Sequence, residues 1–143
     1  MTETARHNYQ QLFLRIALGT ALLSAVADRF GWWGANAAWG NWQNFEAYTR
    51  QLTFFLPESI SKISAYAATV FETAFGLLLI IGFKTRLTAI FTGLLLLAFA
   101  LSMTVSLGIK STLDYSVWVG SAGAFLLACQ DRFSYSIDQV LKK

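Results

Sequence analysis

Long apolar stretches of the chain alternate with short polar segments, and the apolar stretches have the length of membrane-crossing helices. Residues 87–109 contain no charged residue, and 23 residues in a helix cover a hydrocarbon core of about 30 Å at about 1.5 Å per residue. Residues 65–83 carry a charge only at Glu72, and residues 115–130 are uncharged. The pattern predicts an all-α integral membrane protein, a single domain over residues 1–143, with four transmembrane helices in an antiparallel bundle at about residues 12–33, 60–83, 86–109 and 113–130.

The first of these stretches also has features of a cleavable secretory signal. Arg6 precedes it, and Ala25-Val26-Ala27 has the form of the small-residue site at which such signals are cut. However, Arg15 interrupts its apolar region, and three further apolar stretches follow. We therefore expect a transmembrane helix that is retained.

Between the first two spans, an aromatic-rich segment predicts an amphipathic helix at about residues 41–56. Apolar and aromatic side chains recur at helical spacing, with polar residues mostly on the other faces. We expect this interfacial helix to lie on the outer membrane surface, in the first extracytoplasmic loop. Two interpretations are open: a lid over a lipid-accessible pocket, or an aromatic belt at the lipid headgroups. The recurring residues are Trp42, Phe45, Tyr48, Leu52 and Phe55.

The composition supports a membrane protein and argues against several functions. Hydrophobic residues make up 55% of the chain and charged residues 13%, whereas soluble domains average roughly 25% charged. One Cys and one His cannot form a disulfide framework or, within one subunit, a Cys/His zinc site or a bis-His haem site, and no nucleotide-binding glycine motif occurs. We expect no metal, haem or nucleotide cofactor and, because the basic residues are scattered singly, no nucleic-acid partner.

The distribution of Lys and Arg predicts the orientation in the membrane. With four spans, Arg6, Lys84, Arg86, Arg132, Lys142 and Lys143 flank one side, and Arg29, Arg50, Lys62 and Lys110 flank the other. The positive-inside rule then places both termini in the cytoplasm, in a multi-pass protein of the bacterial-type cytoplasmic (inner) membrane.

Glu72 is the main candidate for chemistry because it falls near the middle of the second span. An unpaired carboxylate at that depth costs at least ~2.5 kcal/mol, so the side chain must face protein, water or a ligand. Its neighbours one and two turns away are small or carry a hydroxyl, which lets another helix approach closely. These neighbours are Ala65, Ala68, Thr69 and Gly76.

Arg15 and Arg29 are the two candidate partners of Glu72. They are fourteen residues apart and project from one side of the first helix. Either guanidinium could pair with the carboxylate, although Arg29 lies near the helix end, where extension to the lipid headgroups is the favoured interpretation. An Arg15–Glu72 pair would act as a proton relay or ligand site, or would only fix the register of two helices.

The fourth apolar stretch predicts close packing rather than chemistry. Its small residues recur at i+4 spacing, which is typical of a helix docked inside a bundle. We expect the lone Cys129 at its end to be a small buried side chain. The small residues are Ser116, Gly120, Ala124 and Ala128.

Three segments of the chain resemble the DoxX family of small four-helix membrane proteins. They are Arg15-Ile-Ala-Leu-Gly19 in the first span, Phe55-Leu-Pro57 at the end of the aromatic loop, and Glu72-Thr-Ala-Phe-Gly76-Leu-Leu-Leu-Ile-Ile-Gly82-Phe-Lys-Thr-Arg86. The resemblance covers most of the chain. It implies a membrane subunit associated with redox enzymes, similar to the small DoxD subunit of thiosulfate:quinone oxidoreductase.

What this resemblance implies is a quinone as the cofactor and a redox enzyme as the protein partner. Glu72, positioned by Arg15, would hold the proton that accompanies quinone reduction, and nearby aromatic side chains would pack on the ring. The candidate ligand-binding residues are Trp32, Trp33, Arg29 and Gly76.

Two other functions are open. A non-catalytic anchor would recruit an enzyme through the amphipathic helix or the turn at Lys84 and Arg86, while Glu72 and Arg15 only hold the bundle together. A small transporter would need oligomerisation and a further polar position along its path. Membrane lipids and a second copy of the chain are the other expected partners.

Overall fold

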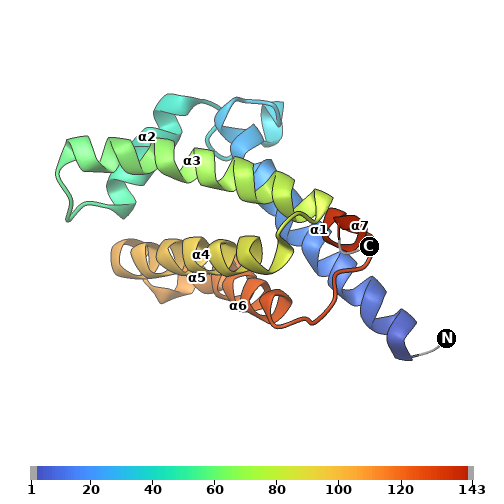
Figure 1. The fold of residues 1–143 in the computed structure, drawn as a ribbon. Helices are drawn as coiled ribbons and strands as arrows, with labels where there is room; N and C mark the ends of the chain where they lie inside the picture. Colours follow the sequence, from blue (N-terminus) through green and yellow to red (C-terminus); the bar gives the residue numbers. More distant parts are fainter. Residues whose placement is uncertain (1–2, 142–143) are drawn as a thin grey trace.

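The computed structural model describes residues 3–141, and these residues form helices joined by short connections, with no β-strand among them (Figure 1). The helices are α1 (Glu3–Arg29), the 3-10 helix η1 (Gly34–Asn36), α2 (Trp42–Leu52), α3 (Glu58–Ile81), α4 (Thr85–Leu107), α5 (Ile109–Asp114), α6 (Val117–Ala128) and α7 (Ile137–Leu141).

Three of these helices are long and apolar enough to cross a membrane. They are Asn8–Arg29 within α1, Glu58–Ile81 and Thr85–Leu107. Large apolar side chains such as Phe13 and Val105 remain 76% and 66% exposed on them. Such surfaces are stable in lipid rather than in water. The chain is therefore a membrane protein with several apolar helices, as the sequence predicts.

The fourth predicted span, residues 113–130, is not a single helix. Gly108 ends α4 with a φ of 86°, and Ser116 breaks the next segment with a φ of 55°. The chain therefore folds into two shorter helices, α5 and α6. The 12 residues of α6 cover only about 18 Å. The prediction of four full-length spans is not confirmed, because the described residues contain three long helices and one apolar helix too short to cross alone.

The first helix ends at Arg29 and not at residue 33 as the sequence pattern suggests. Gly31 adopts a φ of 73°, a left-handed conformation that glycine tolerates at no steric cost. A Cβ at Gly31 would also lie 2.7 Å from the carbonyl oxygen of Gly40, so the loop packs directly on this turn. The chain reverses here, and the segment before α2 folds back on the end of α1.

Two glycines allow α1 and α3 to pack closely in opposite directions. A Cβ on Gly19 would lie 2.8 Å from the carbonyl oxygen of Gly76, and a Cβ on Gly76 would lie 2.8 Å from Cγ of Leu23. The inward-facing small-residue stripe predicted around Glu72 is confirmed. Its members Ala65, Ala68 and Gly76 are buried together with Glu72 itself.

The small residues of α6 pack against α4. Ser121 donates a hydrogen bond of 2.9 Å to the carbonyl oxygen of Gly93, which shows how closely the two backbones approach. Ala124 and Ala128 of the predicted seam are buried, whereas Ser116 is exposed because it belongs to the break before α6. The seam therefore starts one turn later than expected.

The C-terminal segment closes one end of the bundle, where both ends of the described chain lie (Figure 1). The carboxylate of Asp138 accepts hydrogen bonds of 2.7 Å from the backbone N–H groups of Lys84 and Thr85 at the start of α4. Gln11 near the start of α1 donates to the carbonyl oxygen of Ser134 at 3.0 Å. These contacts place the beginning of α1, the α3–α4 turn and the C-terminal segment at the same end.

Candidate functional site

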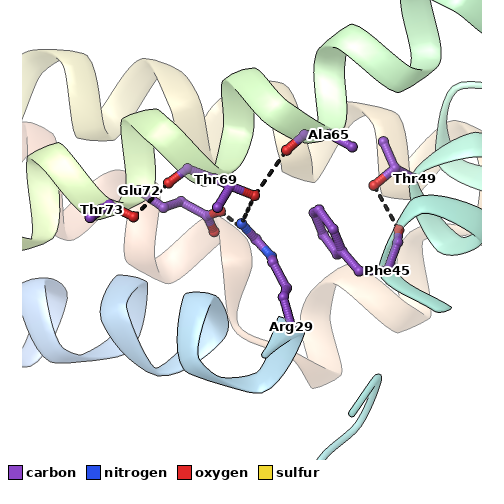
Figure 2. Close-up of polar contacts among 7 residues, drawn as sticks. All are labelled: Arg29, Phe45, Thr49, Ala65, Thr69, Glu72 and Thr73. Carbon is purple, nitrogen blue, oxygen red and sulfur yellow. Dashed lines mark hydrogen bonds and ion pairs between the residues drawn. The ribbon is translucent and has the colours of Figure 1, made fainter. Parts of the chain in front are cut away.

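Arg29 and Glu72 form a buried ion pair between α1 and α3 (Figure 2). Their side chains are only 2% and 4% exposed. Arg29 is the last residue of α1, and Glu72 lies about 21 Å along α3 from its first residue, Glu58. Removing either charge would leave the other buried without a partner, which costs several kcal/mol. The two residues therefore act as one unit.

Thr69 fixes the orientation of the guanidinium. Nη1 of Arg29 donates to Oγ1 of Thr69 at 2.7 Å, and the Thr69 hydroxyl donates to the carbonyl oxygen of Ala65 at 2.9 Å. One turn further, the Thr73 hydroxyl donates to the carbonyl oxygen of Thr69 at 2.7 Å. Figure 2 shows this sequence of contacts along α3. Because the Thr69 proton is used by the backbone, its oxygen is left to accept from Arg29.

Aromatic rings cover the other side of the guanidinium. Cζ of Arg29 lies 3.8 Å from the ring centroid of Phe45 and 5.7 Å from that of Trp39. The two rings pack edge to face, with centroids 5.1 Å apart. A cation over an aromatic face is attracted by the ring, and the rings also exclude water. The guanidinium is therefore enclosed by the Glu72 carboxylate on one side and by the two aromatic rings on the other.

A helix, α2, is found within the predicted residues 41–56, and its position at a membrane surface stays a prediction. Asn41 begins it by accepting a hydrogen bond of 2.9 Å from the backbone N–H of Asn44. The helix ends at Leu52, so Phe55 of the predicted apolar face lies outside it and is 56% exposed. Phe45 turns toward the protein, and α2 contacts α3 and α4. In this position α2 covers the buried Arg29–Glu72 pair, whereas the two predictions from the sequence, a lid over a lipid-accessible pocket and an aromatic belt at the lipid headgroups, stay predictions.

Asp28 holds the loop that carries Trp39. Its carboxylate accepts hydrogen bonds from the backbone N–H groups of Ala38 at 2.7 Å, Trp39 at 2.8 Å and Gly40 at 3.1 Å. Asp28 is 8% exposed. The sequence pattern predicts no role for Asp28, because its partners are backbone groups, which every residue carries. The only indication in the sequence is that Asp28 stands next to Arg29 at the end of an apolar stretch.

Arg15 does not pair with Glu72, contrary to one of the two expectations. It is 1% exposed, and its Nη atoms donate to the carbonyl oxygens of Tyr135 at 2.5 Å and Ser134 at 3.3 Å. About 21 Å of helix separates it from Arg29. Arg15 therefore anchors the C-terminal segment. Arg29, which was expected to extend to the lipid headgroups, is the partner of Glu72 because α2 covers the end of α1.

The predicted aromatic contacts also differ from the observed ones. Trp32 and Trp33 lie beyond the end of α1 and are 79% and 49% exposed, and the indole of Trp33 donates to the carbonyl oxygen of Ser24 at 3.1 Å. Gly76 lies one turn from Glu72 and packs against α1. The rings that contact the ion pair are those of Phe45 and Trp39. The helical spacing of aromatic residues indicates Phe45, whereas Trp39 lies before α2 in the loop that Asp28 holds.

An apolar groove of about 350 Å³ opens beside Thr69. The rings of Trp42 and Tyr66 pack against each other on its wall, with centroids 4.6 Å apart. Phe30 and Val70, which also line it, are 54% and 63% exposed on the outside of the bundle. Thr69 lines the groove and contacts Arg29, so it connects the lipid-facing surface with the buried pair.

Fold and site together define a helical, multi-pass membrane protein with an Arg–Glu pair buried between two membrane-crossing helices and covered by aromatic rings. The chain belongs to the DoxX family, which it matches over residues 10–105. This region contains Arg15, Arg29, Glu72 and the groove, and it ends within α4. No curated protein and no solved structure matches the chain.

Proposed function

We propose that this chain is a membrane subunit of a redox system and binds a quinone or a similar lipophilic ligand in the apolar groove. One contact carries this proposal: the Thr69 hydroxyl that lines the groove also accepts the hydrogen bond from Arg29. A ligand in the groove would be one side chain away from the buried pair. The association of the DoxX family with membrane redox roles supports the same function.

The groove fits a flat ring that carries an apolar tail. Its volume of about 350 Å³ is at the lower end of the range for ligand pockets, which is roughly 300–1,000 Å³. The faces of Trp42 and Tyr66 offer surfaces for stacking. Because Val70 is exposed on the lipid-facing side, a tail could continue from the groove into the bilayer.

A bound quinone supplies a carrier of two electrons and two protons. Glu72 is the buried carboxylate that can hold a proton, and its partner Arg29 is held by Thr69, which lines the groove. Phe45 and Trp39 exclude water from the guanidinium side. We propose that a partner oxidoreductase delivers the electrons, since one Cys and one His cannot supply the ligands of an iron–sulfur cluster or of a bis-His haem within one chain.

Filling the groove should weaken ligand binding without changing the fold. Val70→Trp places a large side chain in the groove, and Val119→Trp is the matched control because Val119 is 71% exposed on α6. We expect Val70→Trp to weaken binding of a short-chain ubiquinone to the protein in nanodiscs by at least tenfold, or about 1.4 kcal/mol, and Val119→Trp to leave it unchanged. Equal affinities for all three proteins would contradict the proposed site.

The anchor alternative has less support from the contacts. The turn at Lys84 and Arg86 is one of the two surfaces through which an anchor would recruit an enzyme, and it already contacts the C-terminal part of the same chain. The backbone of Lys84 binds Asp138, and Arg86 donates to the carbonyl oxygen of Gln130 at 3.0 Å. A partner at this turn would have to bind the C-terminal segment as well.

We also propose that the chain lies in a bacterial-type cytoplasmic membrane with both termini in the cytoplasm, and Cys129 allows a test. It is exposed rather than buried as expected, and it follows α6 at the end where Gln130 contacts Arg86. A membrane-impermeant maleimide should label Cys129 in inverted vesicles but not in intact spheroplasts. Moving the cysteine to the exposed Ala35 of η1, in a Cys129→Ser background, should reverse this result. Labelling of Cys129 from outside would contradict the orientation.

A further inference from the structure

A second groove, of about 530 Å³, lies between α2 and α3, and charged side chains line it. Each helix contributes one acidic and one basic residue: Glu46 and Arg50 from α2, and Glu58 and Lys62 from α3. The side chains of Arg50 and Lys62 are 63% and 56% exposed, so their N–H groups remain accessible to a ligand. These four charged residues are separate from the Arg29–Glu72 pair and have no role in the proposed function.

The charges of this groove cancel. Arg50 pairs with Glu58 at 3.0 Å, and Lys62 lies 3.7 Å from Glu46. Glu46 is held in place by the indole N–H of Trp42, at 3.0 Å. Two cations and two anions on facing helices complement a ligand that carries both charges better than they complement an anion, because an anion would meet two carboxylates.

The charged groove adjoins the apolar groove. Trp42 and Tyr66 line both, and the lining positions of α3 run from Glu58 to Val70, which is about 18 Å along the helix. The charged end lies at the first turn of a membrane-crossing helix. Lipid headgroups and Trp and Tyr side chains meet at that level of a membrane. The two grooves together match a molecule with a polar head and apolar chains.

We propose that the charged groove binds the headgroup of a zwitterionic phospholipid. The phosphate contacts the basic side chains Lys62 and Arg50, and the amine contacts the carboxylates. The first apolar carbons of the lipid pack on Trp42 and Tyr66, and its acyl chains continue onto the lipid-facing surface. This site shares Trp42 and Tyr66 with the apolar groove, but its charged residues do not line that groove, so headgroup binding can fail while quinone binding holds, and the reverse.

Native mass spectrometry of the detergent-purified full chain tests this site, with phosphatidylethanolamine and phosphatidylglycerol as probes. We expect one tightly bound phosphatidylethanolamine and at least fivefold weaker binding of phosphatidylglycerol. Lys62→Gln should reduce phosphatidylethanolamine binding about tenfold, the effect of losing one charge-assisted hydrogen bond. The control Lys110→Gln, at another exposed Lys near the same end of the bundle, should change nothing.

A variant that leaves all charges intact makes the test independent of the ion pairs. Ala47→Trp fills the charged groove, and Ala122→Trp places the same side chain on the exposed face of α6. We expect only Ala47→Trp to lose the lipid. Soluble phosphoethanolamine at the same concentration should not displace it, because the acyl chains contribute to binding. Equal binding of both lipids, retention by Ala47→Trp, displacement by phosphoethanolamine, or a bound protein in place of lipid would each overturn the proposal.

Discussion

Replacing Glu72 by Gln will lower the free energy of unfolding by about 3–5 kcal/mol, because it leaves the Arg29 guanidinium buried without a countercharge. The amide has the size of the carboxylate, so the loss comes from charge and not from packing. Denaturation of the purified protein in a mild detergent measures it. The control Glu58→Gln removes an exposed carboxylate of the same helix and should have little effect.

Replacing both partners distinguishes the cost of leaving one charge unpaired from the cost of removing the whole ion pair. Arg29→Met and Glu72→Leu together leave no unpaired charge, and apolar replacements of a buried pair are often neutral. We therefore expect the double variant to be more stable than either single variant. If the two losses simply add, Arg29 and Glu72 do not depend on each other, and the pair is not the unit that the structure indicates.

Replacing Asp28 by Ala is expected to have the second largest effect. It removes the acceptor of three backbone N–H groups, and leaving such groups unpaired costs about 1–3 kcal/mol each when they stay buried. We expect a net loss of about 3 kcal/mol, since the loop can partly move into water. Amide hydrogen exchange at Ala38, Trp39 and Gly40 should accelerate, because these are the groups that Asp28 protects.

Replacing Asp28 by Ala should also affect the Arg29–Glu72 pair, because it loosens the loop whose Trp39 ring lies over Arg29. Asp28→Asn keeps one acceptor oxygen and should fall between the wild type and Asp28→Ala. Asp114→Ala is the control, since Asp114 is exposed and pairs with Lys110. Unchanged exchange at residues 38–40 in Asp28→Ala would show that the loop is held by other contacts.

The sequence predicted the apolar helices and the inward position of Glu72, and the physical reason is the same for both. A membrane-crossing helix requires a long apolar stretch, which can be recognised in the sequence, and a charged residue inside such a stretch must face protein. The small neighbours of Glu72, from Ala65 to Gly76, then identified the face that packs against another helix. The family resemblance, which depended on the same residues, is confirmed over residues 10–105.

The partner of Glu72 and the break in the fourth apolar stretch could not be predicted from the spacing of apolar residues. They depend on tertiary contacts and on backbone conformation. Arg15 and Arg29 share one side of α1, so only the position of α2 and of the C-terminal segment decides which of them reaches the carboxylate. Those contacts are made to backbone groups by Asp28, Arg15 and Asp138. The break at Ser116 likewise depends on a backbone conformation that its residue type does not demand.

Photocrosslinking with an azido-quinone tests the central claim most directly, because it reports where a lipophilic ligand lies in the intact protein in a membrane. The apolar groove predicts that the label is found on the α3 segment around Thr69 and Val70 and on Phe30, that excess unmodified quinone prevents it, and that Val70→Trp abolishes it. Labelling spread over the exposed apolar side chains of α4 and α6, or labelling that unmodified quinone does not prevent, would show that the groove is not a ligand site.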